Sequence, residues 1–280
     1  MSITRKIYYS LNPRTRLLAR RIYYAPVDLW QLLFKGENKG PVPPKGLIYT
    51  GSGDFIETGN HFLQLLKGYC DLLPNHNILD VGCGIGRIAL PLTKYIDHRG
   101  KYYGFDIVKT GIDWCKVNIS KRFLNFHFEH FNLKNDLYSE EEVKSAKDFI
   151  FPYNDETFDV VVSTSVFTHM MPEDVEQYFS EIRRVLKRNG KCLFTFFILN
   201  PDSEKNMVNN PVFNFNHTFG HYSLMDEKVK EANVAYQEIY LKQLFEVNRL
   251  IITNLFYGYW SDGDIDKVKD FQDLVILTKI

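Results

Sequence analysis

An excess charge of one sign is missing from this sequence of 280 residues. Lysine plus arginine and aspartate plus glutamate each number 34, so the formal net charge is zero. Proteins whose main task is to hold a nucleic-acid backbone carry clustered basic charge in excess. The balance therefore disfavours nucleic acid as a partner.

Closely spaced cysteines and long apolar runs are missing as well. The four cysteines, Cys70, Cys83, Cys115 and Cys192, form no C-x-x-C pair. They predict neither a disulfide framework nor a zinc site, and they indicate a reducing compartment. No apolar run reaches the roughly 18 residues of a membrane-spanning helix, and no signal-peptide pattern is visible. We therefore expect a cytoplasmic protein.

Basic residues are nevertheless concentrated in residues 1–27, which hold six of them and no acidic residue. An apolar stripe at helical spacing follows the same stretch, interrupted by Pro26: Leu18, Ile22, Ala25, Leu29 and Leu33. The pattern predicts a basic amphipathic helix that packs on its own domain. Contact with a membrane surface and a transit peptide are the alternatives that it leaves open.

The proline-rich stretch Gly40–Gly46 marks the end of this arm. We place the arm at residues 1–45 and the main domain at residues 46–280. The main domain is expected to carry two irregular insertions, at residues 134–153 and 200–234, because both are long and lack a regular apolar pattern. Insertions of this kind usually serve as functional loops or lids.

Apolar runs and helical patterns alternate through the domain. Strands are expected at residues 77–81, 101–107, 124–131, 158–166 and 191–199, with helices at 87–96, 110–123 and 172–190. This order predicts an α/β fold, a parallel sheet covered by helices on both faces. After a helix at residues 235–250, two strands at 251–260 and 272–280 lack room for a crossover helix between them, so they should be antiparallel.

The turn "DVGCGIGR" follows the first of these strands and contains Gly82, Gly84 and Gly86. Dinucleotide sites use G-x-G-x-x-G, and Arg87 stands where their third glycine would lie. A phosphate-binding P-loop is excluded because no G-K-[ST] follows. Asp80, two residues before Gly82, would repel a pyrophosphate and favour a nucleoside ligand that carries positive charge. S-adenosylmethionine, with its ammonium and sulfonium groups, fits this requirement.

Asp106 ends the second strand, 20 residues after Gly86. A carboxylate at this place can accept hydrogen bonds from both hydroxyls of a ribose. It indicates an adenosine ligand, although it serves NAD as well as S-adenosylmethionine.

Four segments in this order resemble the class I S-adenosylmethionine-dependent methyltransferases, in particular their bacterial small-molecule branch: "ILDVGCGIGRIALPL", "GFDIVKTGIDWC", "FPYNDETFDVVVSTSVFTHM" and "YFSEIRRVLKRNGKCLFTFF". The resemblance covers about Tyr49 to Ile280. It implies a Rossmann-like sheet of seven strands that is mostly parallel and ends in an antiparallel hairpin.

The resemblance also implies roles for individual residues. Asp80, Gly82, Gly84 and Gly86 would line the methionine end of the cofactor, with Cys83 among them. Asp106 would hold the ribose, Ile107 would flank the adenine, and Ser165 would face the sulfonium. Asn132 stands where the family often has an aspartate that bonds the adenine amine. The stretch Gly51–Phe55 is similar to a segment that closes over the cofactor in close relatives.

His169 follows the fourth strand and is the best-placed general base, since its ordinary pKa lies near neutrality. The alternative is a histidine that orients the loop beneath the cofactor. His217, His221 and Tyr222 are the next candidates. The two histidines have no evident third ligand, so no metal site is predicted.

The acceptor is the least defined part of the prediction. The chain lacks the [DNS]-P-P-[YFW] motif of enzymes that methylate base amines or glutamine, and the paired-glutamate hairpin of arginine methyltransferases is not visible. A hydroxyl of a small molecule is the leading expectation, with S-adenosylhomocysteine as the second product. The alternatives are a carbon or nitrogen acceptor of a small molecule, a cofactor-binding protein without catalysis, a methyltransferase for lipid or nucleic-acid acceptors, and an oxidoreductase. The sequence does not indicate an oligomeric state.

Overall fold

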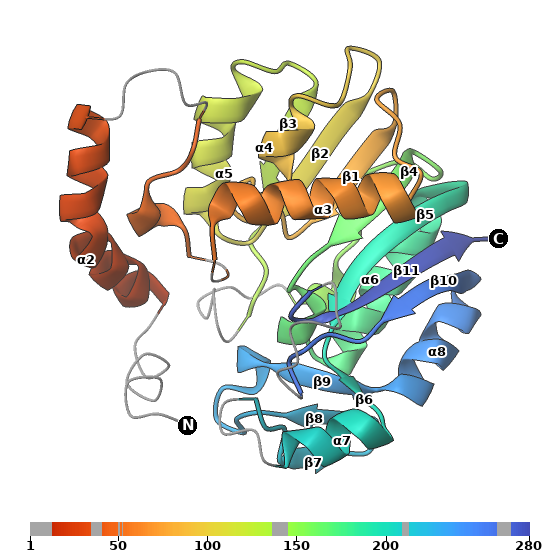
Figure 1. Ribbon diagram of the computed structural model, residues 1–280. Helices are drawn as coiled ribbons and strands as arrows, with labels where there is room; N and C mark the ends of the chain where they lie inside the picture. The colour runs from red at the N-terminus through yellow and green to blue at the C-terminus, as the bar shows by residue number, and fades with distance from the viewer. Residues whose placement is uncertain are drawn as a thin grey trace.

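A central sheet of seven strands organises the computed structural model, which describes residues 13–34, 41–49, 51, 53–135, 145–208, 213–261 and 270–280. The strand order is β10-β11-β5-β4-β1-β2-β3 (Figure 1). The strands are β1 (Asn77–Val81), β2 (Lys101–Asp106), β3 (Phe126–His130), β4 (Phe158–Ser163), β5 (Leu186–Phe196), β10 (Leu250–Phe256) and β11 (Asp273–Lys279). β11 runs antiparallel to both its neighbours and the other pairs are parallel. The predicted Rossmann-like fold and its antiparallel end are confirmed.

Successive residues of the central strands point to opposite faces of the sheet. Ile78, Val160 and Val162 are fully buried on one face, whereas Leu79 and Val161 are fully buried on the other. This alternation within continuous apolar runs is typical of parallel strands that are covered on both sides.

Helices cover both faces. The face with Ile78 packs against α3 (Phe55–Tyr69), α4 (Ala89–Leu92), α5 (Lys109–Cys115) and a π-helical turn, η2 (Lys116–Ser120). The face with Leu79 packs against α6 (Pro172–Val185) and α8 (Glu238–Val247). In α6 acidic residues begin the helix and arginines end it, which suits the helix dipole.

The junction between α6 and β5 differs from the sequence prediction. A helix through residue 190 was expected, but α6 ends at Val185 and β5 begins at Leu186. Leu186 pairs with Phe158, and the register then shifts before Lys191 pairs with Val160. The Asn-Gly sequence at this point forms a bulge within the strand and does not end a helix, since Asn189 has a φ of +59°.

The second expected insertion, residues 200–234, is not irregular. It contains α7 (Pro201–Met207), β7 (His217–Phe219), β8 (Tyr222–Leu224) and η5 (Lys230–Ala232). With β6 (Ile198–Leu199) and β9 (Val234–Gln237), the two strands form a second sheet of order β6-β9-β8-β7. These strands have four residues or fewer, too short for alternation to reveal them. Of the first insertion, residues 136–144 lie outside the described residues, and η3 (Ala146–Asp148) follows them.

The N-terminal stripe is the clearest departure from the sequence prediction. A helix does form, α2 (Pro13–Phe34), but Leu18, Ile22, Leu29 and Leu33 are 57–66% exposed, so the stripe does not pack on the domain. The helix continues through Pro26. None of the described helices is both long enough and apolar enough to span a membrane.

Gly86 packs closely against the helical segment that contains Cys115 and Ile119, and a substitution there tests this packing. Its φ is +79°, and a Cβ there would lie 2.9 Å from Cys115 Sγ and from Ile119 Cδ1. We expect Gly86→Ala to lower the free energy of unfolding by about 1–3 kcal/mol. Gly68→Ala, in α3 with no atom within 4 Å of the added carbon, should raise it by about 0.5–1 kcal/mol. Urea denaturation measures both, and equal stabilities of the two variants would contradict the packing argument.

Candidate active site

A cavity of about 960 Å³ lies at the carboxyl ends of the parallel strands. Residues that follow β1, β2 and β4 line it, and residues before α3 and around β11 complete its wall. Ligands of open α/β sheets bind at this edge, because the loops there are free to vary while the strands hold them in place.

The glycine turn after β1 forms one side of the cavity. Gly82 and Cys83 donate their amide hydrogens to the carbonyl oxygen of Phe105, at 2.9 and 3.0 Å. Gly82 has a φ of +76°, and a side chain there would overlap Val166. Gly82, Cys83 and Gly84 line the cavity as expected. Gly86 is not among the lining residues, so its role is in packing.

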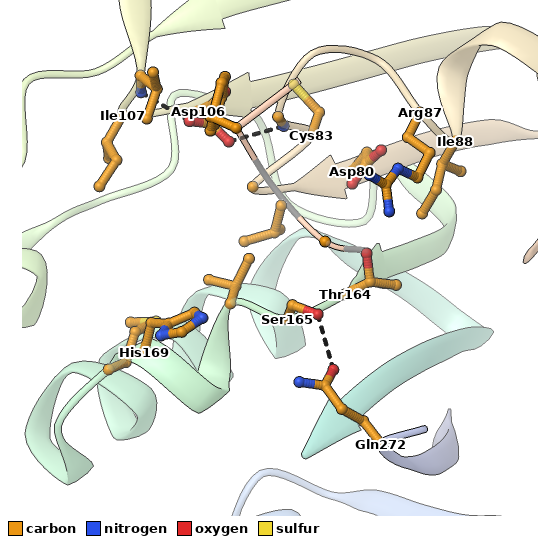
Figure 2. Close-up of a pocket in the computed structure, with 18 of the residues that line it drawn as sticks. Asp80, Cys83, Arg87, Ile88, Asp106, Ile107, Thr164, Ser165, His169 and Gln272 are labelled. Carbon is orange, nitrogen blue, oxygen red and sulfur yellow. Dashed lines mark hydrogen bonds between the residues drawn. The ribbon is translucent and has the colours of Figure 1, made fainter. Parts of the chain in front are cut away.

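Asp106 joins the turns after β1 and β2. One carboxylate oxygen accepts from the amide of Gly84 at 2.8 Å, and the other accepts from the amide of Val108 at 2.7 Å (Figure 2). Each oxygen keeps a lone pair for a ribose hydroxyl. Burial raises the pKa of this carboxyl, and the two amide hydrogen bonds oppose the shift.

Asp80 is buried beneath the glycine turn and also lines the cavity. The hydroxyl of Tyr102 donates to it at 2.6 Å. Burial raises the pKa of Asp80 to about 7, against the lowering effect of the Tyr102 hydrogen bond. The ionised form is thus disfavoured until a positive charge comes near.

The residues expected around an adenine divide into two groups. Ile107 is partly buried and lines the cavity. Asn132 is exposed and is not among the lining residues, whereas the nearby Leu133 and Asn135 are buried and line it. Asn135 donates through its side chain to the carbonyl oxygen of His169 at 2.9 Å, so it also supports the opposite wall.

The turn after β4 forms that opposite wall. Ser165 has a φ of +58°, and its amide donates to the hydroxyl of Thr195 at 2.7 Å. Its own hydroxyl donates to the side-chain oxygen of Gln272 at 2.8 Å. Figure 2 shows Ser165, His169 and Gln272 across the cavity from Asp106 and Ile107. Gln272 had no role in the sequence prediction.

His169 lies in η4 (Phe167–His169) and lines the same wall. Its Nδ1 lies 3.0 Å from the carbonyl oxygen of Glu231 in η5. A carbonyl oxygen only accepts, so Nδ1 carries the hydrogen and the neutral ring has its lone pair on Nε2. Burial lowers the pKa of His169 from its ordinary value, which keeps the ring neutral at pH 7.

The other histidine candidates lie elsewhere. His217 pairs with Glu227 at 3.2 Å, and His221 stacks on Tyr240 with ring centroids 4.2 Å apart. Neither they nor Tyr222 are among the residues that line the cavity. Within the described ranges, no group of three His, Cys, Asp or Glu side chains is placed to hold a metal ion.

Two groups of lining residues had no role in the sequence prediction. The first is Arg87, which lies over the ring of Phe55 at 5.5 Å and whose pKa is lowered by burial. It approaches Gly51 so closely that a side chain at Gly51 would contact its guanidinium. Gly51 and Gly53, in the stretch expected to close over the cofactor, line the cavity beside it, as does Tyr49.

The second missed group is a pair, His61 of α3 and Asp270 before β11. His61 Nε2 lies 3.4 Å from Asp270 Oδ2, and both residues line the cavity. Burial raises the pKa of Asp270, and the nearby His61 opposes that shift. Only the fold brings the two together, so no local sequence signal could have indicated the pair.

Comparisons with known proteins agree with this geometry. A family model described as "Methyltransferase domain" matches residues 79–194, from β1 into β5. Phosphoethanolamine N-methyltransferase 3 of Arabidopsis thaliana is 31% identical over 161 residues, which cover 56% of this chain and 27% of that protein. Mouse arsenite methyltransferase is 28% identical over 123 residues, 44% of this chain and 31% of that protein. The chain thus spans less than a third of the length of these relatives.

A solved structure shares the fold over a longer stretch. The O-methyltransferase of a polyketide synthase from Brevibacillus brevis, solved with S-adenosylhomocysteine, superposes with a TM-score of 0.53 at 17% identity. The match covers 78% of this chain and 71% of that one.

Asp80 makes ligand binding depend on pH. A ligand with an ammonium group binds the ionised carboxylate, so we expect the affinity for S-adenosylhomocysteine to rise with pH through about 7 and then to level off. Below the pKa the affinity should fall by up to about tenfold per pH unit. Calorimetric titration between pH 5.5 and 8 measures this.

Asp80→Asn is the control for this prediction, because it keeps the shape of the side chain and removes the titration. It should bind more weakly at pH 8 and with little dependence on pH. Asp273, whose pKa burial also raises to about 7, is not among the residues that line the cavity. A pH dependence that persists unchanged in Asp80→Asn would show that Asp80 does not face the ligand's charge.

Proposed function

We propose that the chain is a class I S-adenosylmethionine-dependent methyltransferase, as the match of residues 79–194 to a methyltransferase domain supports, and that it transfers the methyl group of S-adenosylmethionine to a hydroxyl of a small-molecule acceptor. The observation that carries the proposal is that the glycine turn with Asp80 and Asp106 lies on one side of the cavity and His169 on the other.

The cofactor end of the cavity fits the methyl donor. Asp80 is a buried carboxylate whose raised pKa would return toward its ordinary value beside an ammonium group. Asp106 presents two oxygens that already hold the glycine turn and can each accept a ribose hydroxyl. Ile107 would flank the adenine, and Ser165 would face the sulfonium. Asn132 is assigned to the adenine amine only by family resemblance, because it is exposed in this structure.

When bound, S-adenosylmethionine supplies a methyl carbon that a nucleophile attacks in line with the departing sulfur. The chain aligns the two reactants and removes water from between them. A hydroxyl acceptor must also lose its proton as the oxygen–carbon bond forms. His169 suits this step because its ring is neutral and Nε2 carries the lone pair.

The acceptor end is largely aromatic. Phe197, Phe213, Tyr259 and Phe271 line it, and Phe197 and Phe271 belong to a cluster around the buried Trp260. Aromatic side chains bind flat apolar bodies through stacking and area burial. We therefore propose an acceptor with an apolar or aromatic body and a hydroxyl directed at His169.

Amine methylation is the second candidate. Apart from Asp80 and Asp106, four acidic residues line the cavity and could hold a cationic amine: Glu57, Asp174, Glu231 and Asp270. A relative named as a phosphoethanolamine N-methyltransferase supports it. The matched part of that relative does not extend to its whole length, so this remains the second candidate.

Paired probes distinguish the two candidates. Each pair shares an apolar aromatic body and differs in one group, a phenolic hydroxyl or a primary amine. Incubation with methyl-labelled S-adenosylmethionine should label the hydroxyl member and produce S-adenosylhomocysteine in equal amount. Exclusive labelling of amines would overturn O-methylation. Tight S-adenosylhomocysteine binding without labelling of any probe would favour a cofactor-binding protein without catalysis.

His169→Ala tests the general base. At saturating cofactor we expect kcat for the labelled hydroxyl probe to fall by about 10²–10⁴-fold, with S-adenosylhomocysteine affinity unchanged. The wild-type rate should decline on the acid side at a pH below the ordinary histidine range, because burial lowers the pKa of His169.

His221→Ala is the matched control, since His221 is not among the lining residues, and it should keep the wild-type rate. His61→Ala covers the competing assignment. If His61→Ala abolishes turnover while His169→Ala does not, the proton acceptor is His61, paired with Asp270.

A further inference from the structure

The N-terminal helix α2 presents a continuous apolar surface to the outside of the molecule. Six large side chains on it are 57–76% exposed, and we call them the apolar face of α2: Leu18, Ile22, Tyr23, Leu29, Trp30 and Leu33. Figure 1 shows α2 at the edge of the molecule, apart from the central sheet. Exposed apolar surface that is contiguous in this way is rare on proteins without a partner for it.

The opposite side of α2 attaches to the domain through polar groups. Asp28 accepts hydrogen bonds from the amides of Lys45 and Gly46, at 2.7 and 2.9 Å. Arg20 donates to the carbonyl oxygen of Lys45 at 3.4 Å, and Arg16 is only 7% exposed. A Cβ at Gly46 would lie 3.0 Å from the Cα of Arg21, so the two backbones touch.

α2 is therefore oriented opposite to an ordinary surface helix, which buries its apolar side and exposes its polar side. The hydrogen bonds of Asp28 fix this orientation, because turning the apolar face inward would break both of them. The fold thus holds the apolar face of α2 outward by specific contacts.

Charge indicates what covers this face. Arg16, Arg20 and Arg21 are the charged residues of the helix with described side chains, apart from Asp28, which already accepts two amides. A second copy of the chain would bring two sets of arginines to one interface without a free carboxylate on either helix. An anionic lipid surface offers negative headgroups to Arg21, which is exposed, and an apolar interior to the leucines and Trp30.

We propose that the apolar face of α2 binds the surface of an anionic lipid bilayer, with the helix parallel to the membrane plane. The helix of 22 residues is about 33 Å long. Leucine side chains and Trp30 enter the acyl boundary, while Arg21 stays at the headgroups. The site does not depend on the proposed methyl transfer, because no residue of the apolar face of α2 lines the cavity.

Vesicle binding by the full chain tests the proposal. The probes are vesicles of phosphatidylcholine alone and of phosphatidylcholine with phosphatidylglycerol. We expect co-sedimentation with the anionic vesicles, a blue shift of the tryptophan emission, to which Trp30 contributes, and at least tenfold weaker binding to the neutral vesicles. High salt should weaken the binding, since exposed charges are screened.

Two variants separate the apolar and charge contributions. Ile22→Ser combined with Leu29→Ser should reduce binding to anionic vesicles by more than about tenfold. Arg21→Gln should reduce it by about fivefold. Leu124→Ser is the matched control, because Leu124 is 85% exposed and does not belong to α2. This substitution should leave vesicle binding unchanged. All variants should bind S-adenosylhomocysteine like wild type, which shows that the domain is folded.

Three outcomes would overturn the proposal. The first is that the chain does not bind anionic vesicles, and the second is that the double serine variant binds them as well as wild type. The third is that wild type does not bind vesicles but forms a dimer in sedimentation velocity, whereas the double serine variant is a monomer. None of these depends on whether an acceptor is methylated, so the proposal can fail while the proposed function stands.

Discussion

The junction between the turns after β1 and β2 holds the cofactor end of the cavity together. Gly82 and Cys83 donate to the carbonyl oxygen of Phe105, and Asp106 accepts the amide of Gly84 in the same turn. A carboxylate so placed is already ordered before a ligand arrives, which spares a bound ribose the entropy of ordering it. The glycine turn, with its positive φ angles, lies over the buried Asp80, which accepts a hydrogen bond from Tyr102. The packing of Gly86 beneath the turn serves the same geometry from the other side.

The wall of the cavity that contains His169 and Ser165 is held in place by segments outside the seven-stranded sheet. His169 is fixed through its Nδ1 by η5, and the hydroxyl of Tyr236 in β9 donates to the carbonyl oxygen of Met170 next to it at 2.5 Å. Gln272, before β11, bonds Ser165 across the turn after β4. η5 and β9 of the second sheet therefore support the candidate base and the residue next to it. The two ends of the cavity thus depend on different segments of the chain, so the lining of one end can change while the geometry of the other is kept.

The sequence predicted what local patterns encode. The strands, the glycine turn and Asp106 are readable because each depends on residues within a few positions. The second sheet escaped prediction because its strands are too short to show alternation, and the helix end at Val185 was misplaced because an Asn-Gly pair serves a bulge as well as a helix stop. Asn132 was placed by family position, but the chain turns so that Asn135 is the buried one. His61 and Asp270 meet only through the fold, so no spacing rule could have paired them.

The apolar stripe of α2 shows what the spacing of apolar residues cannot predict. A helical pattern of apolar residues states that one side of the helix avoids water, but it does not say which partner removes the water. Here the deciding residue is Asp28, whose two amide hydrogen bonds hold the polar side of the helix against η1 (Lys45–Leu47). Leu47, Ile48 and Tyr49 follow and pack with Phe55, and Tyr49 also lines the cavity. The segment that α2 contacts, η1, is therefore followed directly by residues that belong to the wall of the cavity.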